Sequence, residues 1–393
     1  MATAFAVVLA AHALAPSASA QDRPVELRLR SGMTIDDNVF RLPDSAPDPQ
    51  MARGISGKSD RFSTTVVTLV FDKAYAQQRA QFELSQTTTR YDKFSSLDTK
   101  SLDYRGTLLW RLTSRLSGAL TASRSESPLR LEDTQGDQSI VRTTTNRGVT
   151  VDGWLFGGWH VLAGASETRT TSTQTFGAVP DSEQTGSDFG LRYIAPSQST
   201  ITATLRSQQG SLASGAGVAA GAGSSGFTAT ERELNASWIA SGKSTLNGRL
   251  TRIERRYESF PRGDFTGVSG ELGYAWTPTG KLSVSANALR TVAPFFTATT
   301  TYRTEDTLAV GPVLRVSDKA TVRMRAARQT IEFRGPAGRD RRDTLDSLEF
   351  GADWAPHPRV TLTASLRRDQ RSSTDSRAAF GSTIAAVNAA VRF

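Results

Sequence analysis

Residues 281–289 read KLSVSANAL, and this alternation of apolar and polar side chains decides the fold class. Successive side chains of a β-strand point to opposite faces, so a period of two indicates a strand with one apolar face and one wet face. The apolar face here consists of Leu282, Val284, Ala286 and Ala288, and the intervening residues are serine and asparagine. A helix would instead require a period near 3.6, which this stretch does not have.

The same alternation recurs along almost the whole chain. Residues 320–329, ATVRMRAARQ, and residues 359–368, RVTLTASLRR, place apolar side chains on one face and threonine, serine and arginine on the other. No stretch has a convincing helical period. The pattern indicates an all-β protein, either a large soluble β domain or an outer-membrane barrel whose apolar residues are diluted by alternation.

The composition fits strands with one wet face. The hydrophobic share is 38%, the mean hydropathy is −0.34 and cysteine is absent, so no disulfide stabilises the fold. The formal net charge is +9 and the sequence pI about 10.1. Such a charge raises the possibility of nucleic-acid binding, but no recognition motif is present, and we expect no nucleic-acid partner.

An export signal is expected at the start of the chain. Residues 1–20 form an apolar run that ends in Ala18, Ser19 and Ala20, a small-residue cleavage site of the secretory type. We therefore expect a signal peptide over 1–20, a mature chain beginning near Gln21, and one domain over 21–393.

Connections of two lengths alternate along the chain. Short ones are expected at about 72–74, 113–115, 156–158, 195–199, 241–243, 277–280, 317–319 and 356–358. Longer stretches rich in Gly, Ser, Asp and Pro lie at about 36–61, 92–99, 125–139, 172–186, 208–226, 256–264, 293–301, 335–343 and 369–379. The sequence thus predicts a transmembrane antiparallel up-and-down β-barrel of about 18 strands, with 16 possible, in the bacterial outer membrane, with short periplasmic turns, long extracellular loops and periplasmic termini.

The tryptophans support this arrangement. All 6 lie beside predicted short turns, and we expect them to form a periplasmic aromatic girdle, because the amphipathic indole ring favours a membrane interface. They are Trp110, Trp154, Trp159, Trp238, Trp276 and Trp354. Residues 385–393, AAVNAAVRF, alternate and end in Phe393, which resembles the terminal signal of outer-membrane barrels.

The polar parity of the strands would line the lumen. It carries arginines that we expect to contact an anionic or hydroxylated solute: Arg105, Arg111, Arg192, Arg206, Arg249, Arg315, Arg323, Arg325 and Arg367. Acidic residues on this parity are fewer than the arginines: Glu83, Glu233, Glu271, Glu349 and Asp353. Each arginine can equally pair with an acid of a neighbouring strand and stiffen the wall.

Residues 35–44, IDDNVFRLPD, follow the first alternating strand and favour chain reversal. This stretch resembles the N-terminal motif of EpsL-type outer-membrane barrels from exopolysaccharide operons, with matches at Asp36, Asp37, Asn38, Phe40, Arg41, Leu42 and Pro43. The resemblance implies a pore that exports an exopolysaccharide beside periplasmic export and chain-length-control proteins. The residues themselves suggest a strand-end cap or a cation site, with Phe40 and Leu42 as anchors.

The sequence offers no catalytic site. The mature chain has only His160 and His357, both beside predicted short turns, and no nucleophile, metal or cofactor cluster accompanies them. We therefore expect no enzyme and no cofactor. The leading prediction is a passive export channel with a basic lumen. The alternatives are a general diffusion porin for small anions or sugars, or a non-conducting structural or adhesive barrel.

Overall fold

A computed structural model describes residues 24–47, 56–129, 139–174, 178–213, 225–259, 263–297, 300–335 and 338–393. The expected signal peptide and the mature start at Gln21 lie outside these residues. The strands are β1 (Val25–Asp36), β2 (Asp60–Tyr75), β3 (Gln78–Tyr91), β4 (Thr99–Arg111), β5 (Leu116–Pro128), β6 (Val141–Phe156), β7 (Trp159–Ser172), β8 (Ser182–Ile194), β9 (Thr200–Leu212), β10 (Ser225–Ser241), β11 (Ser244–Tyr257), β12 (Phe265–Trp276), β13 (Leu282–Pro294), β14 (Tyr302–Arg315), β15 (Ala320–Gly335), β16 (Gly338–His357), β17 (Val360–Ser373) and β18 (Phe380–Arg392).

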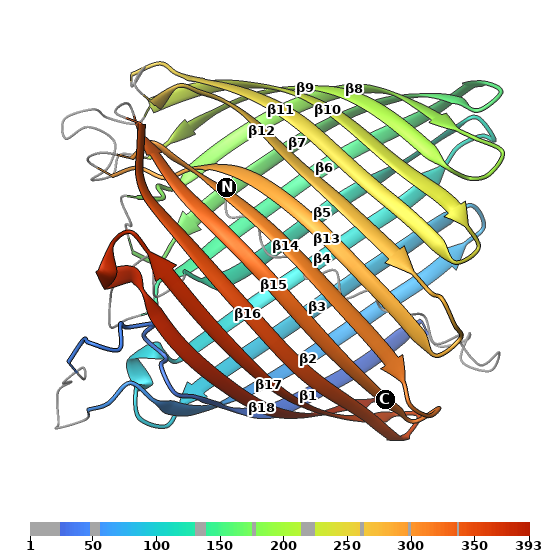
Figure 1. Cartoon of the computed structure of the whole chain (residues 1–393). Helices are drawn as coiled ribbons and strands as arrows, with labels where there is room; N and C mark the ends of the chain where they lie inside the picture. The colour runs from blue at the N-terminus through green and yellow to red at the C-terminus, as the bar shows by residue number, and fades with distance from the viewer. Residues whose placement is uncertain are drawn as a thin grey trace.

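These strands form one closed antiparallel sheet of 18 strands, which confirms the predicted fold class. Each strand pairs with its sequence neighbours, and β1 also pairs with β18, from Arg28 opposite Arg392 to Asp36 opposite Ile384. The tilted strands run side by side around the wall, with β18 next to β1 (Figure 1). A closed sheet has no free edge, so every strand has a backbone partner on both sides.

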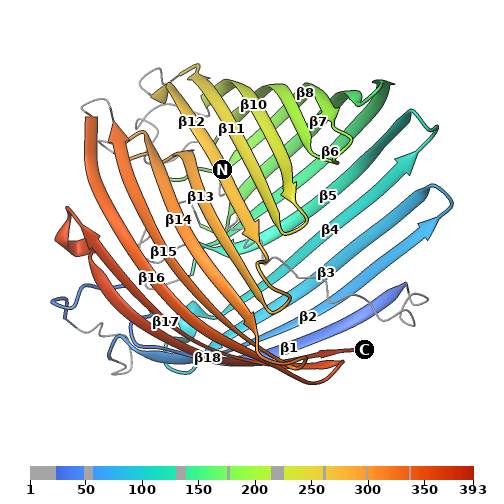
Figure 2. The ribbon, with the colours of Figure 1, turned by 45° about the vertical axis from the view of Figure 1, so that its right-hand side comes forward.

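Short turns and long connections lie at opposite ends of the barrel (Figure 2). The first short turn joins Tyr75 to Gln78, so its predicted place at 72–74 was three residues too early. Strand β15 continues to Gly335 and β16 begins at Gly338, where a longer loop over 335–343 was predicted. In both places the strands extend further than their apolar alternation, because ladder hydrogen bonds continue through polar residues.

Both ends of the described chain lie at the short-turn end. Val25 pairs with Phe71 near the first short turn, and the backbone N–H of Phe393 donates to the carbonyl of Leu27 at 2.9 Å. Two 3-10 turns, η2 (Ser95–Leu97) and η4 (Ser376–Ala378), lie in long connections. Within the described ranges, no helix is long and apolar enough to cross a membrane.

The two faces of the wall differ as the alternation predicts. Outward positions carry large apolar side chains that remain exposed, such as Leu308 (58%), Leu366 (52%) and Val387 (59%). They form an apolar band that begins at the short turns and ends where charged residues such as Arg290 and Asp306 take the outward positions. Inward positions carry most of the threonine, serine, arginine and acidic side chains. The apolar band is the surface expected of a barrel that faces lipid.

Candidate functional site

The candidate site is the inner wall, because the register places all nine predicted lumen arginines on inward positions. Arg323 lies opposite Gly351, Arg325 opposite Glu349, and Glu349 opposite Arg367, on the parity opposite to the exposed apolar residues. The same assignment follows for β4, β8, β9, β11 and β14, whose inward arginines are Arg105, Arg111, Arg192, Arg206, Arg249 and Arg315. Their contact with a solute stays a prediction.

Five of these arginines are held by carboxylates of the wall. Arg192 Nη1 lies 2.7 Å from Asp152 Oδ2, and Arg206 Nη1 lies 3.1 Å from Glu231 Oε2. The other ion pairs join Arg249 to Glu271 (3.1 Å), Arg323 to Asp353 and Arg367 to Asp369 (2.8 Å). These five arginines therefore form ion pairs with acids of the wall, which is the alternative to solute contact that the sequence left open.

The remaining four, Arg105, Arg111, Arg315 and Arg325, are exposed and have no ion-pair partner among the described residues. Glu83 lies opposite Arg105 and Glu349 lies opposite Arg325 in the register, but neither carboxylate forms an ion pair with the arginine it faces. Because these inward guanidinium groups remain exposed, the bore is open to water where they lie. They place uncompensated positive charge where a passing anion can reach it.

Inward acids are more numerous than the five that the sequence predicts. The additional ones in the described strands include Asp72, Asp152, Asp188, Glu231, Glu305, Asp343 and Asp369. Many lie near strand ends, where the apolar alternation that sets the parity fades. Arg28 and Arg30 of β1 also lie on inward positions. They are absent from the predicted lumen arginines, although the alternation in VELRLR indicates their parity.

Near the short-turn end, His160 belongs to an inward polar cluster. Its Nδ1 lies 2.6 Å from Asp152 Oδ1, while Arg192 contacts the other oxygen of the same carboxylate. Although His160 follows the outward Trp159, the register places it opposite Arg192 on the inner wall. Among the described residues, no group of three or more acidic or histidine side chains could hold a metal ion.

At the loop end, a segment between β7 and β8 reaches strands on another side of the barrel. The backbone N–H of Phe296, after β13, donates to the carbonyl of Ala178 at 2.8 Å. Val179 packs against a buried cluster of Phe295, Ile331 and Phe333. Strands β9 to β12 separate these two parts of the wall, so the contact crosses the mouth. We call residues 178–180 with Phe295 and Phe296 the loop bridge.

Buried arginine and aromatic side chains support the loop bridge. Arg142 is 1% exposed, and its guanidinium donates to the carbonyls of Val179 at 2.8 Å and Pro180 at 3.1 Å. Phe296 also joins an aromatic cluster on the inner face of β9 to β12, formed by Leu212, Phe227, Tyr257 and Phe265. The guanidinium of Arg255 lies 4.5 Å from the ring centre of Phe227. The loop bridge and this cluster narrow the loop-side mouth.

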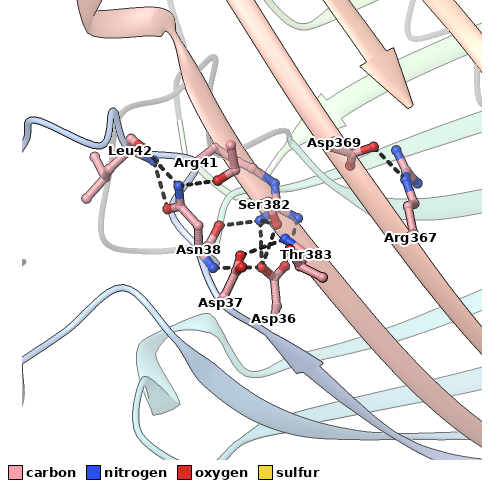
Figure 3. Close-up of polar contacts among 10 residues, drawn as sticks. Asp36, Asp37, Asn38, Arg41, Leu42, Arg367, Asp369, Ser382 and Thr383 are labelled. Carbon is pink, nitrogen blue, oxygen red and sulfur yellow. Dashed lines mark hydrogen bonds and ion pairs between the residues drawn. The ribbon is translucent and has the colours of Figure 1, made fainter. Parts of the chain in front are cut away.

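The motif at the end of β1 forms a polar network with the last strand (Figure 3). One oxygen of Asp36 accepts hydrogen bonds from the Ser382 hydroxyl at 2.9 Å and the Asn38 backbone N–H at 2.9 Å, and the other lies 2.8 Å from Arg41 Nη2. The Asn38 side-chain amide donates to the carbonyls of Leu42 at 2.7 Å and Gly381 at 3.0 Å.

These contacts give the motif a structural use. Asp37 extends the ladder, because its carboxylate accepts the backbone N–H of Thr383 at 2.7 Å. Arg41 has a positive φ of 55° in the turn after β1, where its backbone N–H donates to the carbonyl of Asn38 at 3.1 Å. Phe40 packs edge-on against Phe94 at 4.7 Å in a buried cluster. The oxygens of Asp36 are occupied by protein donors, so the arrangement matches the strand-end cap more closely than the cation site.

The tryptophans divide between the two faces. Trp110, Trp159, Trp238, Trp276 and Trp354 share the outward parity near the short turns, and Trp238 (57%) and Trp354 (52%) are the most exposed. Trp154 lies on the inward parity, where its indole N–H donates to the carbonyl of Gly157 at 2.8 Å and Arg115 lies 4.8 Å from its ring centre. Whether the outward indoles meet lipid stays a prediction.

A closed 18-stranded barrel with an outward apolar band and a charged, water-accessible bore defines a porin-like β-barrel. Solved outer-membrane proteins share this fold. OccK2 (OpdF) of Pseudomonas aeruginosa superposes with a TM-score of 0.52 at 10% identity, covering 94% of this chain and 98% of that chain. OccAB3 of Acinetobacter baumannii gives 0.50 at 12% identity, covering 94% and 99%. OpdK of Pseudomonas aeruginosa, solved with vanillate, gives 0.50 at 10% identity, covering 94% and 99%.

At this identity the likeness establishes the fold and not the solute. No protein-family profile matches the sequence, and no curated protein matches it. Membership in the EpsL-type group, and with it the role in polysaccharide export, therefore stays a prediction.

Proposed function

We propose that the protein is a passive diffusion channel of the Gram-negative outer membrane that favours small anionic solutes. The outward apolar band suits lipid, and the fold is shared with outer-membrane proteins such as OccAB3. The short turns would then face the periplasm, as the lengths of the connections suggest. We infer no catalytic step; the protein acts by shape and charge.

The observation that carries the proposal is that four of the nine predicted lumen arginines are exposed and have no ion-pair partner among the described residues: Arg105, Arg111, Arg315 and Arg325. A cation on the wall of a water-filled bore raises the local concentration of anions, because the surrounding apolar band confines its field. Arg105 and Arg111 come from β4, and Arg315 and Arg325 come from the adjacent strands β14 and β15, on another part of the wall. An anion would therefore meet successive weak contacts and not one tight site.

The loop bridge favours small solutes. Val179 and Pro180 cross the loop-side mouth and are fixed by Arg142 and by the cluster around Phe333. A bulky chain would need these contacts to open, whereas a small ion can pass beside them.

Conductance and selectivity in planar lipid bilayers test the proposal. The purified protein should give steady single-channel currents, and a salt gradient should give a reversal potential of anion preference. In liposome swelling, gluconate should enter faster than glucose of similar size. Cation preference would contradict the proposal. Absence of conductance would favour the alternative of a structural or adhesive barrel with a blocked lumen.

A second candidate is export of an exopolysaccharide together with periplasmic export and chain-length-control proteins. The observation that favours it is the N-terminal motif, Asp36 to Arg41, which resembles that of EpsL-type barrels. Deleting the gene and measuring surface polysaccharide separates the two candidates. Loss of polymer with unchanged uptake of small anions would favour export; retained polymer with slower uptake would favour diffusion.

A further inference from the structure

The outward face of β10 and β11 changes from apolar to basic within one step along the strands. Leu234 and Leu250 face each other across the two strands and are exposed, 45% and 56% respectively. The next outward pair toward the loop end is Arg232 and Arg252, again directly opposite each other. Two like charges in this position repel, so the arrangement is unfavourable unless an anion lies between them.

The protein supplies a single carboxylate between these two arginines. One oxygen of Glu254 lies 3.3 Å from Arg232 Nη1 and 3.2 Å from Arg252 Nε. Arg256, one outward position further, is exposed and has no ion-pair partner among the described residues. The carboxylate of Glu258 lies beyond it, over Gly226. Of the two carboxylates, only that of Glu254 forms ion pairs among the described residues, and Arg232 and Arg252 share it. We call Arg232, Arg252 and Arg256 the basic patch.

Two other outward arginines at the edge of the apolar band, Arg290 and Arg328, are each neutralised by an acid of their own. Arg290 contacts both oxygens of Asp306 at 2.6 and 2.8 Å, and Arg328 contacts both oxygens of Asp346 at 2.7 and 3.0 Å. Each of these arginines has its own bidentate carboxylate, which leaves little free donor capacity. Sharing of a single carboxylate distinguishes Arg232 and Arg252 from them.

The wall around the basic patch is rich in hydroxyl and amide groups. Outward positions at the loop end of β9 carry Ser207, Gln209 and Ser211, and those of β10 carry Thr228 and Thr230. Each outward step along a strand covers about 6.6 Å. This polar surface therefore extends well above the apolar band, further than a phosphodiester headgroup requires, and it offers hydrogen bonds to sugars.

We propose that the basic patch binds a phosphate group of an outer-leaflet glycolipid, the phosphorylated lipid A part of lipopolysaccharide. The proposal rests on the orientation proposed above, in which the short turns face the periplasm and this surface lies in the outer leaflet. The apolar band below Arg232 and Arg252 would contact the acyl chains, the guanidinium groups would bind the phosphate in bidentate fashion, and the hydroxyl groups above would contact the sugars. The bound phosphate would supply the missing negative charge.

Native mass spectrometry of the purified full-length protein in detergent tests the proposal. The probes are bis-phosphorylated lipid A, fully dephosphorylated lipid A and phosphatidylglycerol. We expect the wild-type protein to bind bis-phosphorylated lipid A about tenfold more tightly than the dephosphorylated form. Equal binding of the two forms would overturn the phosphate assignment. Equal binding of phosphatidylglycerol would overturn the glycolipid assignment.

A pair of matched variants locates the site. Arg232→Gln with Arg252→Gln should weaken binding of bis-phosphorylated lipid A about tenfold. Arg290→Gln with Arg328→Gln removes the same charge from the same face and should change it less than about twofold. Equal losses in the two variants would overturn the assignment to the basic patch. Folding of each variant is checked by heat-modifiable gel mobility. If a variant misfolds, the proposal is judged from the binding of bis-phosphorylated and dephosphorylated lipid A by the wild-type protein. Channel conductance is measured separately, so failure of the lipid A proposal can be distinguished from failure of the proposed channel function.

Discussion

Asp36 and Ser382 join the first and last strands of the barrel. The Ser382 hydroxyl donates to the Asp36 carboxylate at 2.9 Å, although 346 positions separate them, and the residues are 0% and 4% exposed respectively. Arg41 contacts the same carboxylate at 2.8 Å. The seam that closes the barrel is therefore held at its loop end by a buried, charge-assisted network as well as by the backbone ladder.

We predict that Asp36→Ala destabilises the barrel by about 2–3 kcal/mol, because it leaves the Arg41 guanidinium and the Ser382 hydroxyl without their acceptor. The measurement is the denaturant midpoint of the folded band on semi-native gels. The exposed Asp44, whose carboxylate forms no interaction among the described residues, supplies the control Asp44→Ala, which should leave the midpoint unchanged. Equal stability of both variants would show that the backbone ladder alone holds the seam.

Arg325→Gln should reduce the anion preference of the channel. This exposed guanidinium has no ion-pair partner among the described residues, so its removal takes away uncompensated positive charge. The double variant Arg323→Gln with Asp353→Asn removes an existing ion pair and keeps the net charge, so its reversal potential should stay near that of the wild type. The measurement is the reversal potential in a salt gradient. An unchanged reversal potential in Arg325→Gln would mean that permeating ions do not pass close to this position of β15.

Phe333→Ala should raise the single-channel conductance and the open-channel noise. The Phe333 ring is 3% exposed and packs with Phe295 at 5.2 Å, which together support Val179 of the loop bridge. Removing it leaves a cavity and loosens the crossing contact. The control is Phe94→Ala, which removes a 2% exposed ring from the separate cluster beside Phe40. A conductance that rises equally in both variants would point to general loosening of the rim.

Single-tryptophan variants should differ in quenching by brominated lipids. Retaining only Trp238 or only Trp354 should give strong quenching near the headgroup depth, because these indoles are outward and exposed. Retaining only Trp154 should give weak quenching, since its ring lies on the inward parity against Arg115. Steady-state fluorescence in reconstituted vesicles is the readout. Strong quenching of Trp154 would contradict the assigned face.

Much of the wall could be predicted from local patterns. Side-chain alternation in stretches such as 281–289 and 359–368 assigned the two faces correctly, because a strand places neighbouring residues on opposite sides by its covalent geometry. The nine lumen arginines were placed on the inward parity for the same reason. The predicted strand ends were less accurate, as at the first turn, which follows Tyr75. There the backbone ladder continues through residues that no longer alternate between apolar and polar.

The site depends more strongly on distant contacts. Arg323 pairs with Asp353, whereas Arg325 has no ion-pair partner within the part of the chain that the structure describes. This difference depends on side-chain positions in neighbouring strands, which alternation leaves open. Nothing local in the sequence indicates that Ala178 meets Phe296 across the mouth. The motif at Asp36 was visible as a polar strand end, but its partner Ser382 follows from barrel closure.

The sequence by itself determined that this chain forms strands with one apolar and one polar face, and the lengths of the connections determined their order and approximate number. These properties follow from residues within a few positions of each other. The tertiary structure decided which charges are neutralised, where the mouth narrows and how the seam is fixed. Those features depend on residues brought together by closure of the sheet, which fixes distances that a linear pattern does not contain.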